Sequence, residues 1–202
     1  MVCPSMMTNV NYISPYIFTE TLLPLMSSIA LSDPESDVRI VNVSSNAHKF
    51  LPSSPPIKFT DVEDFCPEYT GKLGAALMRY GHSKLIEILW TKHLQHRLDS
   101  STPPVPIIVI SIHPGAVDTY SDRYPIARLL KPLLYGADRG SHTSIFAAAG
   151  KIVKEKAGVY KGQYLVNNPV GKIVRPTKPA DDEQLAEDLY QLTRKFLDGI
   201  GL

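Results

Sequence analysis

The chain has 202 residues, 44% hydrophobic and 20% charged, a composition typical of one globular domain over residues 1–202, which excludes a disordered tail or a fibre. Its 21 Lys and Arg against 20 Asp and Glu give a net charge of +1, which argues against a nucleic-acid partner. Two cysteines, Cys3 and Cys66, cannot build a disulfide framework and lack neighbours at metal-ligand spacing, so we predict a reducing, cytoplasmic compartment and no metal site.

The first predicted elements are a long helix and a buried strand. Residues 9–31 carry apolar side chains at helical spacing. Polar residues and prolines interrupt this segment and no Lys or Arg precedes Arg39, so we predict neither a signal peptide nor a membrane span. Residues 38–43 are short and β-branched and end at Ser44 and Ser45, which predicts a buried strand.

A long connection then leads into a second helix and a second strand. Residues 46–71 are polar and contain several prolines, and residues 73–98 present a broad apolar helical face. Residues 107–112 form an apolar run that stops at His113 and Pro114, because proline cannot continue a central ladder. Two apolar strands joined through a helix predict a βαβ crossover and therefore a parallel sheet.

The remaining elements continue the alternation. We predict helices at residues 126–135 and 139–151, a third short strand at residues 162–166 and a closing helix at residues 181–198. The predicted fold class is therefore α/β, with about three strands in a parallel sheet and helices flanking it.

Candidate functional side chains gather where the strands end. In open parallel sheets ligands bind beyond the carboxyl ends of the strands, and here Ser44 and Ser45 follow the first strand and His113 follows the second. Tyr80 and Lys84 lie four residues apart within the intervening helix, so they share one of its faces. An ammonium beside a phenol favours the phenolate, which would make Tyr80 a usable general acid or base.

Four segments of the chain resemble signature segments of the short-chain dehydrogenases and reductases, and they occur in the same order along the chain as in that family. Residues 80–84 (Tyr-Gly-His-Ser-Lys) are similar to the family's Tyr-x-x-Ser-Lys signature, residues 41–45 to its catalytic-serine strand, and residues 112–115 to its later turn. Asn11 lies in a segment similar to the helix that carries the family's catalytic asparagine. Within the family, the Val-Ser-Ser-Asn-Ala-His run at residues 43–48 most resembles the retinol-dehydrogenase and WW-domain-oxidoreductase branch, and fungal biosynthetic reductases have similar features.

The resemblance implies two sets of site residues. The catalytic residues would be Asn11, Ser45, Tyr80 and Lys84. The residues that bind the cofactor would be Tyr80, Lys84, Pro114, Gly115, Val117 and Thr119.

The resemblance also implies a role for each catalytic residue. Tyr80 would exchange the proton of the substrate hydroxyl or carbonyl, and Ser45 would hydrogen-bond the same oxygen. Lys84 would hold the nicotinamide ribose, and Asn11 would position a water that connects Lys84 to solvent. The cofactor would be NADP or NAD, with NADP slightly preferred. The substrate would be an apolar small-molecule ketone or secondary alcohol, including those of fungal secondary metabolism.

The resemblance covers nearly the whole chain but only part of the family's domain. Members open with a strand and a glycine-rich turn for the cofactor pyrophosphate, whereas the first glycine here is Gly71 and no Gly-x-Gly-x-x-Gly run occurs. We therefore expect an N-terminally truncated domain: a partial Rossmann-type doubly wound sheet that corresponds to the C-terminal half. Its first strand should lie at an exposed edge beside apolar surface.

Two alternatives stay open beside the oxidoreductase. One is a non-catalytic or partner-dependent protein with a binding or regulatory role, in a homo- or hetero-oligomer. The other is a non-redox enzyme that uses Tyr80 and Ser45 for isomerisation or dehydration. Cofactor titration separates the oxidoreductase from both. His48, His82 and His113 receive no role, because their spacing does not match a set of metal ligands.

Overall fold

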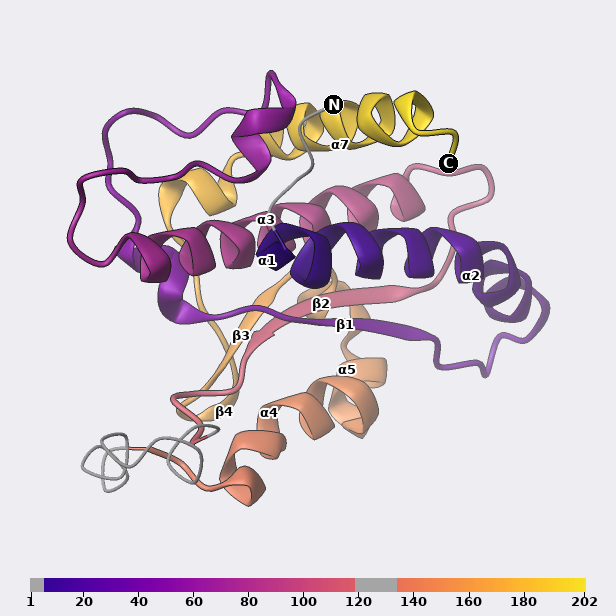
Figure 1. Cartoon of the computed structure of the whole chain (residues 1–202). Coiled ribbons are helices and arrows are strands. Elements are labelled where there is room, and N and C mark those ends of the chain that lie inside the picture. Colours follow the sequence, from indigo (N-terminus) through magenta and orange to yellow (C-terminus); the bar gives the residue numbers. More distant parts are fainter. Residues whose placement is uncertain (1–5, 119–133) are drawn as a thin grey trace.

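Four strands form one sheet in the order β1-β2-β3-β4 (Figure 1). The structure, a computed structural model, describes residues 6–118 and 134–202. The strands are β1 (Arg39–Val43), β2 (Ile108–His113), β3 (Tyr164–Asn167) and β4 (Val170–Ile173). β1, β2 and β3 are parallel to one another, and β4 pairs with β3 in the antiparallel sense. The α/β class and the largely parallel sheet predicted from the sequence are confirmed.

The central strand β2 contributes to a hydrophobic core on each side of the sheet. Ile107, just before the strand, and Val109 belong to one buried cluster, whereas Ile108, Ile110 and Ile112 belong to the other. Successive side chains of a strand point to opposite faces, so a strand covered on both faces must be apolar at every position. The isoleucines and valine of this strand, which alternate between the two clusters, therefore indicate a sheet enclosed by helices on both faces.

The N-terminal helical segments, the long helix α3 and the C-terminal helix α7 pack on the Val109 face (Figure 1). They are α1 (Met6–Thr8), the π-helix η1 (Asn9–Ile13), α2 (Ser14–Ser32), α3 (Ala75–Asp99) and α7 (Glu183–Gly199). Aromatic rings join them: the Tyr12 ring centroid lies 5.8 Å from that of Trp90 and 6.3 Å from that of Phe65. This packing fixes η1, and with it Asn11, against α3.

Shorter helices cover the opposite face of the sheet (Figure 1). They are α4 (Ala137–Ala149), α5 (Lys151–Glu155) and α6 (Ala157–Tyr160). Ala147 and Val153 are fully buried there against the isoleucines of β2. Helices on both faces of a mostly parallel sheet make the fold doubly wound, as predicted.

The structure corrects three details of the sequence prediction. The antiparallel strand β4 was not predicted, because it has only four residues and contains Gly171, a residue type depleted in strands. The connection over residues 46–71 contains two 3-10 helices, η2 (Asn46–Phe50) and η3 (Val62–Phe65). The helix predicted at residues 126–135 falls mostly outside the described residues, and its last residue, Tyr135, instead forms a β-bridge with Val117.

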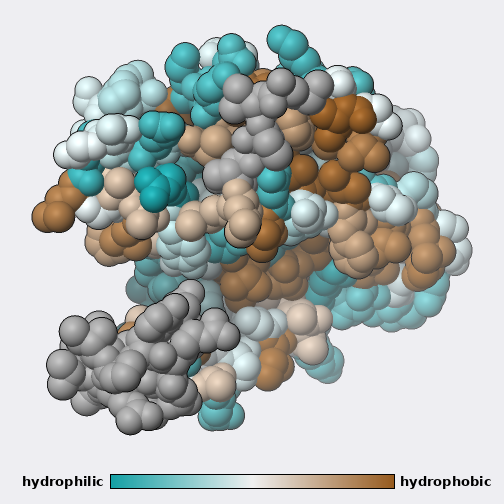
Figure 2. All heavy atoms as spheres, viewed as in Figure 1, coloured by the Kyte–Doolittle hydropathy of each residue, from teal (hydrophilic) through white to brown (hydrophobic). Residues whose placement is uncertain are grey.

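Strand β1 forms one edge of the described sheet, as expected. Apolar side chains of β1 and α2 are exposed: Val43 on β1 is 48% exposed, and Phe18 and Leu25 on α2 are 67% and 61% exposed. Figure 2 shows apolar surface over α2 and β1 on this side of the molecule. None of the helices in the described residues combines the length and apolar character needed to cross a bilayer.

Candidate active site

The carboxyl ends of β1 and β2 bring two predicted segments to the same edge of the sheet. Val43 and Ile112, the last paired residues, lie opposite each other in the parallel register. Ser44, the first residue after β1, therefore lies beside His113, the last residue of β2. The buried Ser44 hydroxyl donates a hydrogen bond of 2.6 Å to the backbone carbonyl of Lys84, which joins the end of β1 to α3.

Lys84 is held where β1 ends and faces Tyr80. Its side chain is about 10% exposed, and its Nζ donates to the backbone carbonyl of Val43 at 2.8 Å. The same Nζ lies 5.6 Å from the centre of the Tyr80 ring. The structure thus brings the predicted phenol and ammonium together on one helix face.

Asn11 reaches the same segment from a different helix. Its Nδ2 donates to the Ser83 hydroxyl at 2.9 Å, and that hydroxyl donates to the Tyr80 backbone carbonyl at 2.8 Å. Asn11 and Tyr80 are separated by 69 positions in the sequence, so only the packing of η1 against α3 makes this connection. The Ser83 hydroxyl thus connects Asn11 to the helical turn of α3 that carries Tyr80, the tyrosine turn.

Ser45 begins the short helix η2, which packs on α3 beside Tyr80. The Ser45 hydroxyl oxygen accepts a hydrogen bond of 3.1 Å from the Ala47 amide, so it caps η2 and keeps its own proton for donation. A Cβ placed on Gly81 would lie 2.5 Å from the Ala47 carbonyl oxygen. Gly81 therefore lets η2 approach α3. A glycine directly after Tyr80, inside a helix, was the available sequence signal for this role.

His48 and Tyr164 hold the turn of residues 45 and 46, the serine turn, by hydrogen bonds. His48 Nδ1–H donates to the Ser45 carbonyl at 2.6 Å, and the Tyr164 hydroxyl donates to Asn46 Oδ1 at 3.1 Å. The two rings meet edge to face with centroids 5.3 Å apart. Burial lowers the pKa of His48, which favours its neutral form, and raises the pKa of the Tyr164 phenol. Neither residue was assigned a role from the sequence.

The turn after β2 is shaped by Gly115. Its φ of +96° is a left-handed conformation that favours glycine, and a Cβ there would lie 2.2 Å from Asn167 Nδ2. His113 Nδ1 and Asn167 Nδ2 are both buried without a hydrogen-bond partner in the described residues. Pro114 precedes this turn and Val117 follows it, whereas the predicted cofactor residue Thr119 lies outside the described residues.

His82, two residues after Tyr80 on α3, forms hydrogen bonds with the connection over residues 46–71. Its Nε2–H donates to the Asp64 carbonyl at 2.9 Å, and its Nδ1 accepts a long hydrogen bond of 3.4 Å from the Tyr69 hydroxyl. Burial lowers the pKa of His82 from 6.5 to about 4.

This pKa shift predicts acid sensitivity of the fold. The unfolded chain takes up a proton on His82 below pH 6.5 while the folded chain does not, so the stabilisation is full above pH 6.5 and lost as the pH falls toward 4. We expect this residue to account for about 3 kcal/mol of that loss. Urea unfolding at several pH values should show that the unfolding free energy of His82→Gln depends less on pH than that of the parent. An equal pH dependence in the two proteins would contradict the assignment.

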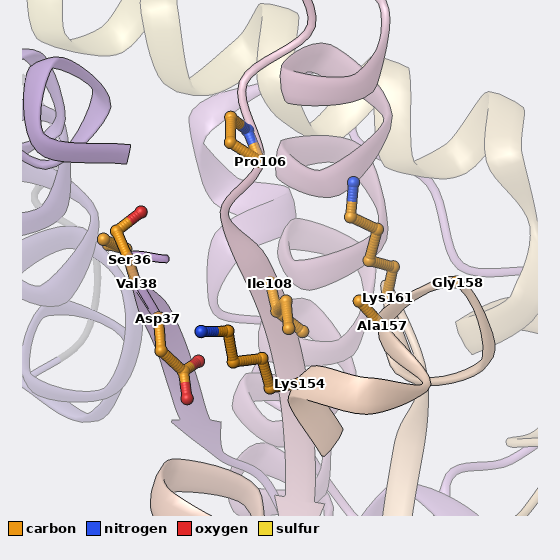
Figure 3. Close-up of a pocket in the computed structure, with 9 residues that line it drawn as sticks. All are labelled: Ser36, Asp37, Val38, Pro106, Ile108, Lys154, Ala157, Gly158 and Lys161. Atoms are coloured by element: carbon orange, nitrogen blue, oxygen red, sulfur yellow. The ribbon is translucent and has the colours of Figure 1, made fainter. Parts of the chain in front are cut away.

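The cavity in Figure 3 lies at the opposite end of the strands. It has a volume of about 310 Å³ and is bounded by Val38, just before β1, and by Ile108 at the start of β2. Its two lysines are engaged elsewhere, since Lys154 Nζ donates to the Glu35 carbonyl and Lys161 Nζ contacts Asp99. The cavity is therefore separate from the serine and tyrosine turns.

The described residues contain no group of three His, Cys, Asp or Glu side chains that could hold a metal ion. The candidate site in these residues consists of a phenol, an ammonium, a hydroxyl and an amide around the carboxyl end of the sheet.

Comparison with known proteins points to one class of relatives. No protein-family model matches the chain. A short-chain dehydrogenase/reductase of Armillaria gallica is 36% identical over 201 residues, which cover 93% of this chain and 59% of that protein. A short chain dehydrogenase/reductase of Macrophomina phaseolina is 32% identical over 148 residues and covers 70% of this chain and 71% of that protein.

Two further similarities extend this result. Retinol dehydrogenase 12 of Mus musculus is 27% identical over 173 residues, which cover 79% of this chain and 48% of that protein. The crystal structure of an uncharacterized protein from Mycobacterium paratuberculosis superimposes with a TM-score of 0.60 at 21% identity, covering 95% of this chain and 58% of that one, which shows a shared fold. This chain spans about half the length of several curated relatives that it matches.

Proposed function

Because the chain belongs to the short-chain dehydrogenase/reductase family, we propose that it acts as an NAD(P)-dependent oxidoreductase that reduces a ketone or oxidises a secondary alcohol. The observation that carries the proposal is the convergence of Tyr80, Lys84 and Asn11 beside the Ser45 turn. These four residue types supply a proton donor, a cation, an amide and a hydroxyl at one edge of the sheet.

The described residues fit the nicotinamide end of such a cofactor. Lys84 Nζ uses two donors on protein oxygens and has a third hydrogen left for a ribose hydroxyl. The unpartnered His113 Nδ1 and Asn167 Nδ2 beside the Gly115 turn offer further polar contacts. No glycine-rich turn between a strand and a helix occurs in the described residues, so these residues do not form a pyrophosphate site.

The roles of the residues follow from their chemistry. The bound nicotinamide supplies or accepts the hydride. Tyr80 donates its phenolic proton to the carbonyl oxygen in reduction and takes it back in oxidation. The Ser45 hydroxyl proton is not used by the described residues, so Ser45 can donate a hydrogen bond to the same oxygen as negative charge develops there, without transferring the proton. Lys84 stabilises the resulting phenolate by its positive charge, and Asn11 holds the tyrosine turn through Ser83.

The proposed substrate is an apolar small molecule, with NADP preferred over NAD as the cofactor. The similarity to a protein named retinol dehydrogenase supports an apolar alcohol or its carbonyl counterpart. The fungal relatives, which include proteins of Armillaria gallica and Gibberella zeae, are compatible with a substrate from fungal secondary metabolism.

Cofactor titration tests the proposal. The purified chain is titrated with NADPH, NADH and reduced nicotinamide mononucleotide, and binding is followed by calorimetry. We expect all three to bind, because the residues proposed to hold the cofactor lie at the nicotinamide end that the three molecules share. The proposed preference for NADP predicts tighter binding of NADPH than of NADH. Lys84→Ala should weaken all three, since it removes the ribose contact.

The same titration examines the alternatives. If none of the three nicotinamides binds to the folded chain at millimolar concentration, the oxidoreductase proposal is rejected. A non-catalytic role in an assembly, or acid–base chemistry without nicotinamide, would then take its place. The lack of a Gly-x-Gly-x-x-Gly run in the sequence is the observation that keeps the non-catalytic role as the second candidate.

A further inference from the structure

A buried carboxylate lies directly behind the lysine of the candidate site. Glu87, one helical turn after Lys84 on α3, accepts a hydrogen bond from Lys84 Nζ at Oε1, at a distance of 2.8 Å. The two side chains are only 7% and 10% exposed, respectively. The acid–base scheme built from Tyr80, Ser45, Lys84 and Asn11 makes no use of this carboxylate.

The surroundings of Glu87 do not explain it as a structural ion pair. Its second oxygen, Oε2, is buried without a hydrogen-bond partner in the described residues, and so is the indole N–H of Trp90 on the next turn. Burying a charge pair gains little stability unless its remaining polar atoms are satisfied. Within the described residues, Glu87 Oε2 therefore stays unpaired next to Lys84, whose positive charge acts on Tyr80 in the proposed acid–base role.

Glu87 and Trp90 line a cavity of about 250 Å³ along the edge of β1. Asn11 and Pro15 line it from the helical side, and Asn42 is among the β1 residues on the strand side. None of these three side chains titrates. Lys84 is the charged group of the described residues that acts on the Glu87 carboxyl.

We propose that Glu87 is a positioning residue that holds the Lys84 ammonium between the Val43 carbonyl and the Tyr80 ring, and sets how much positive charge Tyr80 senses. The Val43 carbonyl oxygen and Glu87 Oε1 each accept one of the three Nζ hydrogens, so the third hydrogen points away from both. When it is ionised, the Glu87 carboxyl at 2.8 Å also offsets much of the ammonium charge. This inference rests on the proposed acid–base role of Tyr80.

The protonation state of Glu87 determines the net charge of the Glu87 and Lys84 pair beside Tyr80. Burial raises the pKa of the Glu87 carboxyl to about 8, and Lys84 opposes the rise. The pair of Glu87 and Lys84 carries a net positive charge when the carboxyl is protonated and is neutral when it is ionised. Loss of the carboxylate therefore favours the Tyr80 phenolate.

The test measures the ionisation of Tyr80 in the purified chain without cofactor or substrate. The chain is labelled with [¹³Cζ]tyrosine, and the Tyr80 resonance is identified by its absence in Tyr80→Phe. In Glu87→Gln the midpoint of the Tyr80 ionisation should move to lower pH by about half a unit to one unit. Glu87→Asp retains the charge but draws it back from Nζ, and should move the midpoint by less in the same direction.

A matched control separates this effect from a general loss of charge. Glu187 on α7 accepts from His93 Nε2 of the same helix α3 at 3.0 Å, so Glu187→Gln also removes one carboxylate paired with α3. This variant should leave the Tyr80 midpoint in place. Thermal melting of every variant verifies that it is folded, and Glu87→Asp decides the question if Glu87→Gln does not fold.

The outcome is independent of nicotinamide binding. An unchanged Tyr80 midpoint in the folded Glu87 variants would overturn the inference even if the chain binds NADPH. A shifted midpoint in a chain that binds no nicotinamide would support the coupling of Glu87 to Tyr80 and reject only the oxidoreductase function.

Discussion

Replacing Tyr80 by phenylalanine should lower kcat/KM for carbonyl reduction by about 10²- to 10⁴-fold, the range that a positioned general acid contributes. The variant removes the transferable proton and keeps the ring over which Lys84 Nζ lies at 5.6 Å. Because phenylalanine keeps the aromatic ring and removes only the hydroxyl, the melting temperature should stay within about 2 °C of the parent. Steady-state kinetics with NADPH and a panel of apolar ketones measures the effect.

A second tyrosine provides the control for this experiment. Tyr160 on α6 packs edge to face against Phe146 with ring centroids 5.8 Å apart, on the far side of the sheet. Tyr160→Phe makes the same chemical change away from the site and should leave kcat/KM unaltered. Turnover that survives Tyr80→Phe at the parent rate would refute the proposed proton transfer.

Gly81→Ala should damage both the fold and the site. The new Cβ would lie 2.5 Å from the Ala47 carbonyl oxygen and 3.0 Å from its carbon, and a backbone group cannot rotate away as a flexible side chain could. Forcing η2 off α3 should cost about 1 to 3 kcal/mol of unfolding free energy. It should also displace the Ser45 turn that η2 carries, and reduce turnover by about 100-fold if the shift reaches 1 Å.

Gly199→Ala is the matched control for the glycine experiment. Gly199 is also helical, at the end of α7, but a Cβ there would meet nothing within 4 Å. Alanine in place of this glycine should leave stability unchanged or raise it by up to about 1 kcal/mol. Denaturant unfolding compares the two variants, and equal effects at both positions would show that the contact with Ala47 is unimportant.

Several features could be predicted because they depend on local patterns. The apolar run at residues 107–112 predicted a strand of a parallel sheet, and β2 is such a strand, with Val109 in one core and Ile108 in the other. The spacing of Tyr80 and Lys84 placed them on one helix face, and the structure confirms it. The antiparallel β4 could not be predicted, because four residues around Gly171 gain their pairing from β3 rather than from their own propensity.

The sequence by itself determined the class of the fold, the parallel order of β1 and β2, and the residue types that carry the candidate chemistry, since periodicity and turn residues act over short spans of chain. Only the tertiary structure decided that Asn11 reaches Ser83, that Gly81 admits the backbone of Ala47, and that Glu87 is buried against Lys84. The first two depend on contacts between elements far apart in the chain. Glu87 is three residues from Lys84, but its burial is set by the elements packed around α3, and burial is what gives a carboxylate influence over a neighbouring charge.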